Sequence, residues 1–354
     1  MTAGFTAATL DSLGIDDALA RLAPCSPNVE VELARLALAE PFCIAGHIFE
    51  EVETAVLRLE ADGHVGHAEA AGVFYRGDMP SDIVAALREA KETIARGIGH
   101  ADSARLFPAG GARNAFDCAL WDLQAKRMGL PVWQLLGIAP PAPLLTTYTI
   151  GSDTPDGMAA KAVLYSEARA IKIKLVGDAA DASRVAAVRA ARPDVWLAVD
   201  ANRSLAPESV CRLLPALEAA DVRLIEQPFA VGRDAELAGL NLPIPVAADE
   251  SIQTMSDLER LAGLYQAVNV KLDKCGGLTD GLRLAQRARQ LGLDVMVGNM
   301  LGSSLAMAPA FLLGQFCSIV DLDGPIFLAA DCVPGVSYRG GRIDCMPHPW
   351  GSGR

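Results

Sequence analysis

Residues 171–175 read Ile-Lys-Ile-Lys-Leu (IKIKL), a short alternation of apolar and basic residues. In a β-strand alternate side chains share a face, so Lys172 and Lys174 are expected to project together while the apolar residues pack on the other side. On an edge strand such lysines would lie in water and discourage unwanted pairing. A buried polar site would instead require carboxylates or a metal ion nearby. The rest of the sequence decides between these two interpretations.

Eight short apolar segments, of which this is the second, alternate with helical stretches from about residue 144 onward. They read LLTTYTI, AIKIKL, VWLAVD, VRLIEQ, IPVAAD, AVNVKL, LDVMVG and CSIVDLD. Polar residues near their C-terminal ends recur at intervals of 22 to 28 residues: Thr149, Lys174, Asp200, Glu226, Asp249, Lys271, Asn299 and Asp321. This spacing favours a parallel (β/α) barrel over the alternative of an open, doubly wound sheet.

The region before the barrel reads as a small α+β domain. It contains two strands, VEVELARLAL and EVETAVLRLE, a helix expected to begin with Ser81 as its N-cap, and a second helix that ends at Gly129. Residues 1–28 have no interpretation beyond an amphipathic helix around Leu10–Leu22. We therefore expect an N-terminal extension over residues 1–28, an α+β domain over 29–140, the barrel over 141–325, and a C-terminal segment, 326–354, that returns to the α+β domain.

Composition narrows the class of protein. The chain has 354 residues, 51% of them hydrophobic, and a formal net charge of -12 without a basic cluster, which argues against a nucleic-acid partner. No secretory signal or long apolar run is recognisable, so we expect no membrane association and a cytoplasmic location. The 8 cysteines form no C-x-x-C pair, and the 5 histidines have no metal-binding spacing. Any metal ion should therefore be held by oxygen.

Three carboxylates end three consecutive predicted strands. Asp200 ends LAVD, Glu226 ends LIE and Asp249 ends VAAD, so in a barrel they converge on one side of the mouth. Three anions so close together repel one another unless a cation joins them. Oxygen ligands with room for water favour Mg²⁺, with Mn²⁺ as a close substitute.

Lysines flank this carboxylate trio. Lys174 lies on the strand before it and Lys271 on the strand after it, while Lys172, one pleat from Lys174, is expected to lower the pKa of its neighbour by like-charge repulsion. Two opposed lysines suit a reaction in which one removes the proton α to a carbonyl and the other returns a proton to the opposite face. The pattern thus predicts racemisation or epimerisation.

The order KIK, DANRS, EQP, ADES and KLDKCGG resembles the enolase superfamily in its muconate-lactonising subgroup. The superfamily's use of a lysine or histidine base with Mg²⁺ is a known pattern. The resemblance covers nearly the whole chain, including ALWDLQAKRMGLPVWQLLG. It implies a (β/α)7β-type barrel whose mouth is covered by an α+β capping domain formed mainly by the N-terminal region.

The last barrel strand narrows the activity. In VDLDGP, Asp321 and Asp323 lie one pleat apart, similar to the pair with which dipeptide epimerases bind the substrate's α-ammonium group. The resemblance implies 1,1-proton transfer at the α-carbon of a dipeptide's C-terminal residue through an enolate. N-acylamino-acid racemase and o-succinylbenzoate synthase are the alternatives, and a non-catalytic binding barrel is a remote one because buried lysines and carboxylates are costly. A sugar-acid dehydratase would resemble its relatives in carrying a histidine in LDVMVGNML, which has none.

Carried over by position, the resemblance assigns a role to each site residue. Lys174 and Lys271 become the acid/base pair, Lys172 an electrostatic modifier, and Asn202 a support for the metal ligands. Glu250 and Lys274 are expected to point outward or to lie behind the ligands. The Mg²⁺ ligands are Asp200, Glu226 and Asp249, and the remaining substrate contacts are Thr149, Met300, Ser303 and His47.

Residue His47 marks a departure from the family pattern. Relatives that prefer L-Ala-D/L-Glu are similar in this cap loop but place an arginine there, whereas PFCIAGHIF offers His47, a weaker anchor for a carboxylate. Arg76, in GVFYRGD, is a candidate substitute. The sequence therefore leaves open whether the second residue of the dipeptide is glutamate, neutral or apolar, and also whether the chain forms a homo-oligomer.

Overall fold

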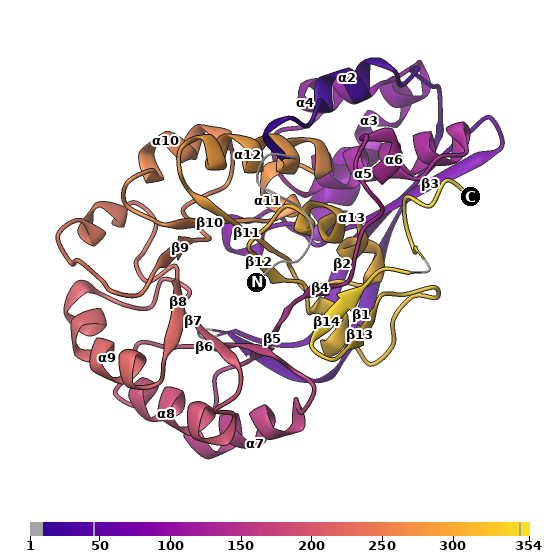
Figure 1. Cartoon of the computed structure of the whole chain (residues 1–354). Helices are drawn as coiled ribbons and strands as arrows, with labels where there is room; N and C mark the ends of the chain where they lie inside the picture. Colours follow the sequence, from indigo (N-terminus) through magenta and orange to yellow (C-terminus); the bar gives the residue numbers. More distant parts are fainter. Residues whose placement is uncertain (1–9, 45–46, 347) are drawn as a thin grey trace.

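The protein consists of a parallel barrel and an N-terminal cap. The computed structural model describes residues 10–44, 47–346 and 348–354. In Figure 1 the barrel strands form a ring, and the cap lies beside it in indigo and violet. Within the described ranges, no helix is both long and apolar enough to cross a membrane.

The eight barrel strands follow one another around the ring in chain order, each parallel to its neighbours. The last strand of the series lies next to the first, which nearly closes the sheet. This confirms the predicted barrel and excludes the open sheet. The strands are β5 (Thr147–Ile150), β6 (Ala170–Lys174), β7 (Trp196–Asp200), β8 (Val222–Glu226), β9 (Val246–Ala248), β10 (Ala267–Val270), β11 (Asp294–Gly298) and β12 (Ile319–Asp321).

Helices cover the outside of the barrel, but unevenly. The predicted strand-then-helix rhythm is interrupted after β8, where only a 3-10 turn, η3 (Asp234–Leu237), precedes β9, and after β9, where η4 (Met255–Asp257) and the single turn α10 (Leu258–Leu261) replace a full helix. Prolines 228, 243 and 245 and glycines 232 and 239 lie between β8 and β9, and they disfavour a helix there. The regular helices are α7 (Pro155–Leu164), α8 (Asp181–Ala191), α9 (Pro207–Ala219), α12 (Leu278–Gln290) and α13 (Ser304–Gly314).

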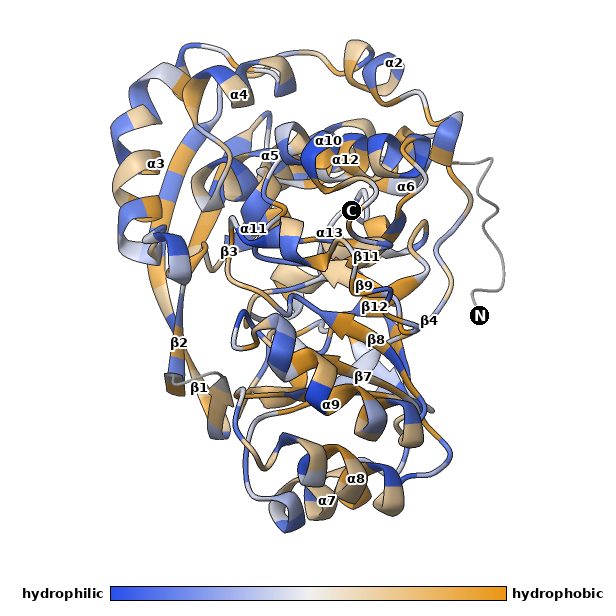
Figure 2. Ribbon diagram, turned by 90° about the vertical axis from the view of Figure 1, so that its left-hand side faces the viewer, coloured by the Kyte–Doolittle hydropathy of each residue, from blue (hydrophilic) through white to orange (hydrophobic). Residues whose placement is uncertain are grey.

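Small side chains fill the inside of the barrel. A separate buried cluster consists of Ala198, Leu224, Ala247, Ala267 and Met296, one residue from each of five consecutive strands. Figure 2 shows these strands mostly in orange, which marks hydrophobic residues. Because this layer excludes water from the barrel interior, the polar residues at the C-terminal strand ends form the floor of the mouth.

The cap is built on a three-stranded antiparallel sheet of β1 (Asn28–Ile44), β2 (His47–Ala61) and β3 (His64–Ala70). The two predicted strands pair with each other, with Val31 opposite Leu57, and the pairing continues past an irregularity between Ala37 and Phe42. The short elements that follow are η1 (Phe74–Arg76), η2 (His100–Asp102), α4 (Ser103–Leu106) and α6 (Val132–Leu135).

Two long helices pack on this sheet. The first, α3 (Pro80–Ala95), begins two residues earlier than predicted, with Met79 and not Ser81 as N-cap, because Pro80 suits the first helical position, where its missing N–H is not needed. The second, α5 (Gly111–Met128), ends as predicted at Gly129, whose φ of 64° is the left-handed conformation that glycine tolerates.

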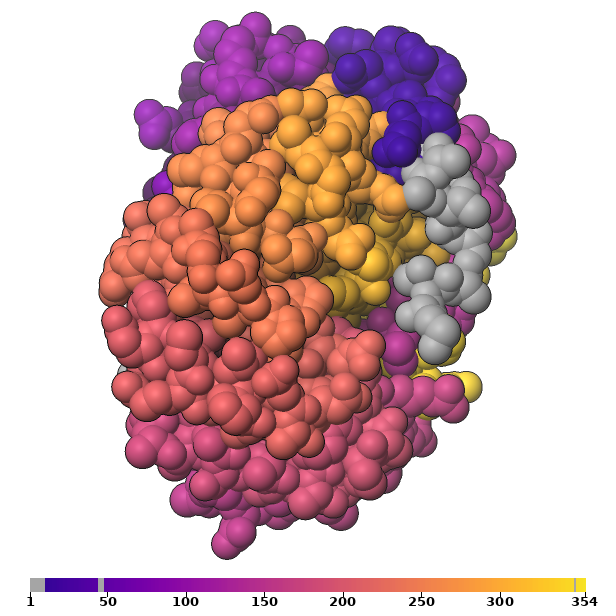
Figure 3. Space-filling view, turned by 60° about the vertical axis from the view of Figure 1, so that its left-hand side comes forward, coloured from indigo at the N-terminus to yellow at the C-terminus, as the bar shows by residue number. Residues whose placement is uncertain are grey.

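Both described chain ends pack against other parts of the molecule. The indole N–H of Trp350 donates to the carbonyl of Cys118 in α5 (2.9 Å), and the C-terminal hairpin, β13 (Ser337–Arg339) with β14 (Arg342–Asp344), pairs with β4 (Leu144–Leu145). Near the N-terminus, the short helix α2 (Ile15–Ala20) lies over α12, where Gln286 donates to the carbonyl of Leu10 (2.8 Å; Figure 3, indigo beside orange). The domain boundaries drawn from the sequence stay a prediction.

Candidate active site

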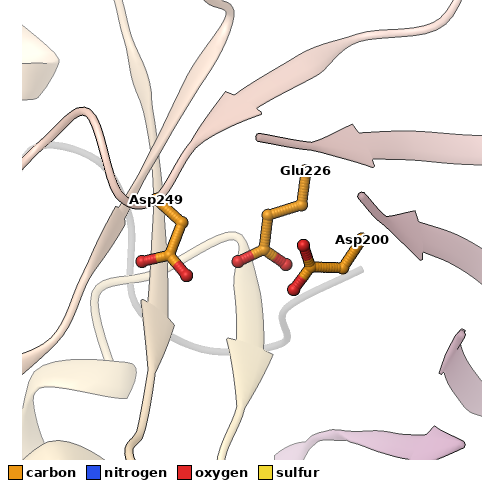
Figure 4. A group of neighbouring side chains, drawn as sticks. All are labelled: Asp200, Glu226 and Asp249. Atoms are coloured by element: carbon orange, nitrogen blue, oxygen red, sulfur yellow. The ribbon is translucent and has the colours of Figure 1, made fainter. Parts of the chain in front are cut away.

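Three carboxylates meet at the mouth of the barrel. Asp200 and Glu226 end β7 and β8, and Asp249 follows β9; each offers an oxygen within 4.8 Å of the others, and all three are almost fully buried. Figure 4 shows the three carboxylates turned toward one another. The structure therefore brings together the trio that the sequence singled out.

Negative charge outweighs positive charge around Glu226, although Lys172 Nζ lies 3.2 Å from its carboxylate. Burial, followed by repulsion from Asp200, raises the pKa of Glu226 to about 7. Buried polar atoms without a hydrogen-bond partner among the described residues lie beside the trio: Asn202 Oδ1 and Glu250 Oε2. The backbone N–H of Asn202 donates to Asp200 Oδ1 (2.9 Å) and so orients that carboxylate. An all-oxygen donor set with excess negative charge and unsatisfied oxygens fits a hard divalent cation such as Mg²⁺.

Lysines stand on both sides of the trio. Lys174 Nζ lies 2.6 Å from Asp200 Oδ2, and Lys271 Nζ lies 2.7 Å from Asp249 Oδ2. Their strands, β6 and β10, flank the three carboxylate strands, so the two ammonium groups approach from opposite sides. Burial opposes the charge on Lys271, but the Asp249 carboxylate outweighs it and raises the pKa of the lysine.

Lys172, one pleat from Lys174 on β6, is surrounded by carboxylates. Its ammonium binds Asp321 and lies 3.2 Å from Glu226 and 3.8 Å from Asp200. Although burial opposes its charge, these three carboxylates raise its pKa well above the ordinary value. Lys172 is therefore a cation paired inside the carboxylate cluster, and its role as an electrostatic modifier of Lys174 stays a prediction.

A fourth ammonium group lies behind the metal-binding trio, which is one of the two positions expected for it. Lys274, expected to lie outward or behind the ligands, is buried and donates to Asp249 Oδ1 (2.6 Å) and to the backbone carbonyls of Asp249 (2.7 Å) and Asn269 (2.9 Å). It belongs to α11 (Leu272–Cys275), a single turn that folds back onto the strand end. The K-x-x-K spacing of KLDK was the available signal, because residues three apart share one side of a helical turn.

The predicted acid pair of the last strand is buried beside the same cluster. Asp321 accepts hydrogen bonds from Lys172 and from the Thr147 hydroxyl, and Asp323 accepts one from the backbone N–H of Thr149 (2.6 Å). Burial would raise the pKa of Asp321, yet Lys172 lowers it, whereas burial and the neighbouring Asp321 raise the pKa of Asp323 to about 6. Asp323 thus lacks a full charge partner.

A cavity of about 300 Å³ connects these groups with the cap. Thr149 and Met300 line it as expected, but Ser303 does not: Ser303 caps α13, and its backbone N–H donates to Glu69 of β3 (2.8 Å). The side chain of His47 lies outside the described residues. The barrel contributes Thr149, Lys172, Lys174, Asn202, Arg203, Asp249, Glu250, Lys271, Asn299, Met300, Leu301, Asp321, Asp323 and Phe327, and the cap contributes Phe42, Phe49, Glu51, Val52, Glu53, Ala71, Gly72, Phe74, Tyr75, Met79 and Pro80.

The second cap loop was not assigned to the site from its sequence beyond Arg76. Its Tyr75 lines the cavity and lies under the Arg203 guanidinium, 5.1 Å from ring centroid to Cζ. The backbone N–H of Gly72 donates to Asp273 Oδ1 in α11 (2.9 Å), which fixes this cap loop to the barrel. No pattern in GVFYRGD marks these contacts, because they depend on how the cap docks.

Comparison with known proteins identifies the class of this capped barrel. Residues 157–329 match the enolase C-terminal domain-like family, and residues 28–137 match the N-terminal domain of mandelate racemase and muconate lactonizing enzyme. The chain therefore belongs to the mandelate racemase / muconate lactonizing enzyme family of the enolase superfamily, which confirms the resemblance found in the sequence.

Its relatives include enzymes with two kinds of substrate. The L-Ala-D/L-Glu epimerase of Escherichia coli (strain K12) is 37% identical over 86% of this chain and 96% of the relative. The N-acetyl-D-glutamate racemase of a Pseudoalteromonas species is 43% identical over 67% of this chain and 75% of the relative. Both are isomerases, and both are named for a glutamate derivative.

Solved structures extend the comparison. An enolase family member from Agrobacterium tumefaciens with homology to dipeptide epimerases, holding sodium and L-Ala-L-Glu, is 37% identical with a TM-score of 0.88, over 92% of this chain and 100% of that one. A dipeptide epimerase from Enterococcus faecalis V583, complexed with Mg and L-Leu-L-Tyr, is 28% identical with a TM-score of 0.82, over 90% of this chain and 96% of that one.

Proposed function

We propose that the protein is a Mg²⁺-dependent dipeptide epimerase that inverts the α-carbon of the substrate's C-terminal residue. The observation that carries the proposal is the placement of Lys174 and Lys271 on opposite sides of the carboxylate trio, 2.6 Å from Asp200 and 2.7 Å from Asp249. Inversion at carbon requires a base on one face and an acid on the other, which a single lysine cannot provide.

The trio of Asp200, Glu226 and Asp249 would hold the metal ion. Bound there, Mg²⁺ supplies positive charge that stabilises the negative charge developing on the substrate's carboxylate and, by repulsion, favours the neutral form of nearby lysines. Asn202 supports this site by donating its backbone N–H to Asp200 (2.9 Å).

The proton transfer then uses the two lysines in turn. Nζ of one lysine removes the α-proton, and the electron pair of the C–H bond moves into the substrate's carboxylate. The ammonium of the other lysine delivers a proton to the opposite face of the same carbon. Lys172, neutralised by Asp321 and Glu226, keeps the carboxylate cluster compact and takes no proton itself.

Asp321 and Asp323 bind the free α-ammonium group of the dipeptide in this account. Asp323 supports this role more strongly than Asp321 does. Burial and Asp321 raise the pKa of Asp323 to about 6, so its charged form is disfavoured, and a bound ammonium group would stabilise that charged form. Asp321 ends β12 and Asp323 follows it, whereas the trio lies at the ends of β7, β8 and β9, so the two groups would hold opposite ends of a dipeptide.

Replacing Asp323 by asparagine should lower kcat/KM for a free dipeptide sharply, because a desolvated ammonium would lose half of its partners, at a cost of about 2–5 kcal/mol. Steady-state kinetics with L-Ala-L-Glu measures this. The exposed Asp294, at the opposite end of β11, serves as the matched control, and Asp294→Asn should leave kcat/KM unchanged. Equal activity of Asp323→Asn and the native protein would remove the ammonium-binding role.

The second candidate function is racemisation of an N-acylated amino acid, which the 43% identity to an N-acetyl-D-glutamate racemase favours. An N-acyl substrate has no ammonium group for Asp321 and Asp323. Proton NMR with L-Ala-L-Glu and N-acetyl-L-glutamate in parallel separates the two. We expect faster inversion of the dipeptide; faster inversion of N-acetylglutamate would make the racemase the correct assignment.

A further inference from the structure

Four cationic side chains line the active-site cavity among the described residues: Lys172, Lys174, Lys271 and Arg203. The three lysines are all paired with the metal-binding trio or with Asp321. Arg203 alone pairs with a carboxylate outside both groups, that of Glu250, through Nε at 3.1 Å. Arg203 takes part in neither metal binding nor proton transfer in the proposed function.

The guanidinium of Arg203 contacts Tyr75 and Glu250 and has donors to spare. It stacks on the Tyr75 ring at 5.1 Å, and Nε, which faces Glu250, is buried. The side chain as a whole is 35% exposed. Since an arginine carries five N–H donors, the terminal nitrogens remain available for a second carboxylate. A guanidinium stacked on an aromatic ring is pre-organised for bidentate binding.

The position of Arg203 matches where the side chain of the inverted residue must project. In the proposed function, the substrate's carboxylate lies at the trio on β7 to β9 and its ammonium group lies at the acid pair at the end of β12. The α-hydrogen points toward a lysine. The remaining substituent of the α-carbon points out of the barrel toward the cap. Arg203 follows β7 and reaches Tyr75 of the cap, so its guanidinium lies at this boundary between barrel and cap.

Other charged groups of the cavity strengthen this placement. Glu51 and Glu53 are the charged cap residues in the described lining, and Arg35 neutralises Glu53 at 3.1 Å. A negatively charged side chain is therefore disfavoured along the β2 wall and favoured at Arg203. Arg76, the alternative that the sequence offered, does not line the cavity.

We infer that Arg203 binds the side-chain carboxylate of the residue that is inverted, so that the preferred substrate carries glutamate or aspartate at this position. The inference rests on the proposed function, because it uses the orientation of the dipeptide given above. It assigns the specificity of this chain to a residue of the β7 loop, in place of the cap-loop position that His47 occupies.

Matched substrates test the inference on the native protein. L-Ala-L-Glu and L-Ala-L-Gln have the same size and differ in charge, so we expect kcat/KM to favour the glutamate dipeptide by about 10- to 100-fold, the range for a hydrogen bond to a charged group. Equal kcat/KM for the two would overturn the inference without any mutation.

Substitutions at Arg203 and Arg76 show which residue produces the preference for the glutamate dipeptide. Arg203→Met should lower kcat/KM for L-Ala-L-Glu by about 10- to 100-fold and change that for L-Ala-L-Gln by less than about threefold, so that the preference disappears. Arg203→Lys should keep part of it, since an ammonium keeps the charge but loses the planar fork. Arg76→Met is the control and should leave the preference intact. Equal losses for both substrates in Arg203→Met, or loss of the preference in Arg76→Met, would contradict the inference.

A parallel series separates this inference from the function on which it rests. N-acetyl-L-glutamate and N-acetyl-L-glutamine are compared with the same three variants. If only the N-acetyl compounds are inverted, dipeptide epimerisation is wrong, yet loss of the glutamate preference in Arg203→Met still supports the role of Arg203. If dipeptides are inverted without any effect of Arg203→Met on the preference, the function stands and the inference fails.

Discussion

Replacing Lys174 or Lys271 by alanine should stop epimerisation, lowering kcat by about 10²- to 10⁴-fold or more, because each lysine serves one face of the α-carbon. Each variant should nevertheless still exchange the α-proton of one epimer with solvent deuterium, since the remaining lysine can remove and return a proton on its own face. The two variants should exchange opposite epimers. Proton NMR of both epimers in D₂O measures the exchange.

The control for these variants is Lys161→Ala, which removes a surface lysine paired with Glu40 and should leave both reactions unchanged. Circular dichroism establishes that each variant is folded, which matters because removal of Lys271 leaves Asp249 with one ammonium partner fewer. Normal epimerisation by both Lys174→Ala and Lys271→Ala would show that the two-base scheme is wrong.

Removing divalent metal ions with a chelator should lower turnover by about 10³-fold or more. Adding Mg²⁺ or Mn²⁺ should restore it. The reason is the carboxylate trio, in which burial and repulsion from Asp200 raise the pKa of Glu226 to about 7 when no cation is bound. Calorimetric titration with Mn²⁺ gives a second readout, and Asp200→Asn should weaken binding by about tenfold or more.

The exposed Asp294 again provides the matched control, and Asp294→Asn should bind Mn²⁺ as the native protein does. Undiminished activity in a rigorously metal-free sample would exclude the trio as a catalytic metal site. Undiminished Mn²⁺ affinity in Asp200→Asn would show that the ion is held elsewhere.

The barrel and the positions of its charged residues could be predicted from the sequence because both depend on local patterns. Each strand is a short apolar run, and in a parallel barrel the C-terminal strand ends meet at one mouth. Lys174, Asp200, Glu226, Asp249 and Lys271 therefore came together as the spacing required. The rhythm alone predicts a helix after β8, but the prolines and glycines between β8 and β9 prevent it.

The contacts of the site were less predictable because they depend on side chains from distant elements. The sequence placed Lys172 one pleat from Lys174 but gave no sign of its contact with Asp321, 149 residues later. Ser303 was predicted to line the cavity, but it binds Glu69 of the cap instead. Arg203 carried no signal at all, since its importance arises from Tyr75 and Glu250, which only docking of cap and barrel brings to it.

The most direct test of the account follows the hydrogen at the α-carbon during the first turnovers of L-Ala-L-Glu in D₂O with Mg²⁺ present. Two opposed lysines predict that the newly formed L-Ala-D-Glu carries deuterium at its α-carbon while the remaining substrate still carries hydrogen, because the base that removes the proton is not the acid that supplies its replacement. Transfer of the substrate's own α-hydrogen into the product epimer, or the absence of any inversion, would contradict the two-lysine mechanism.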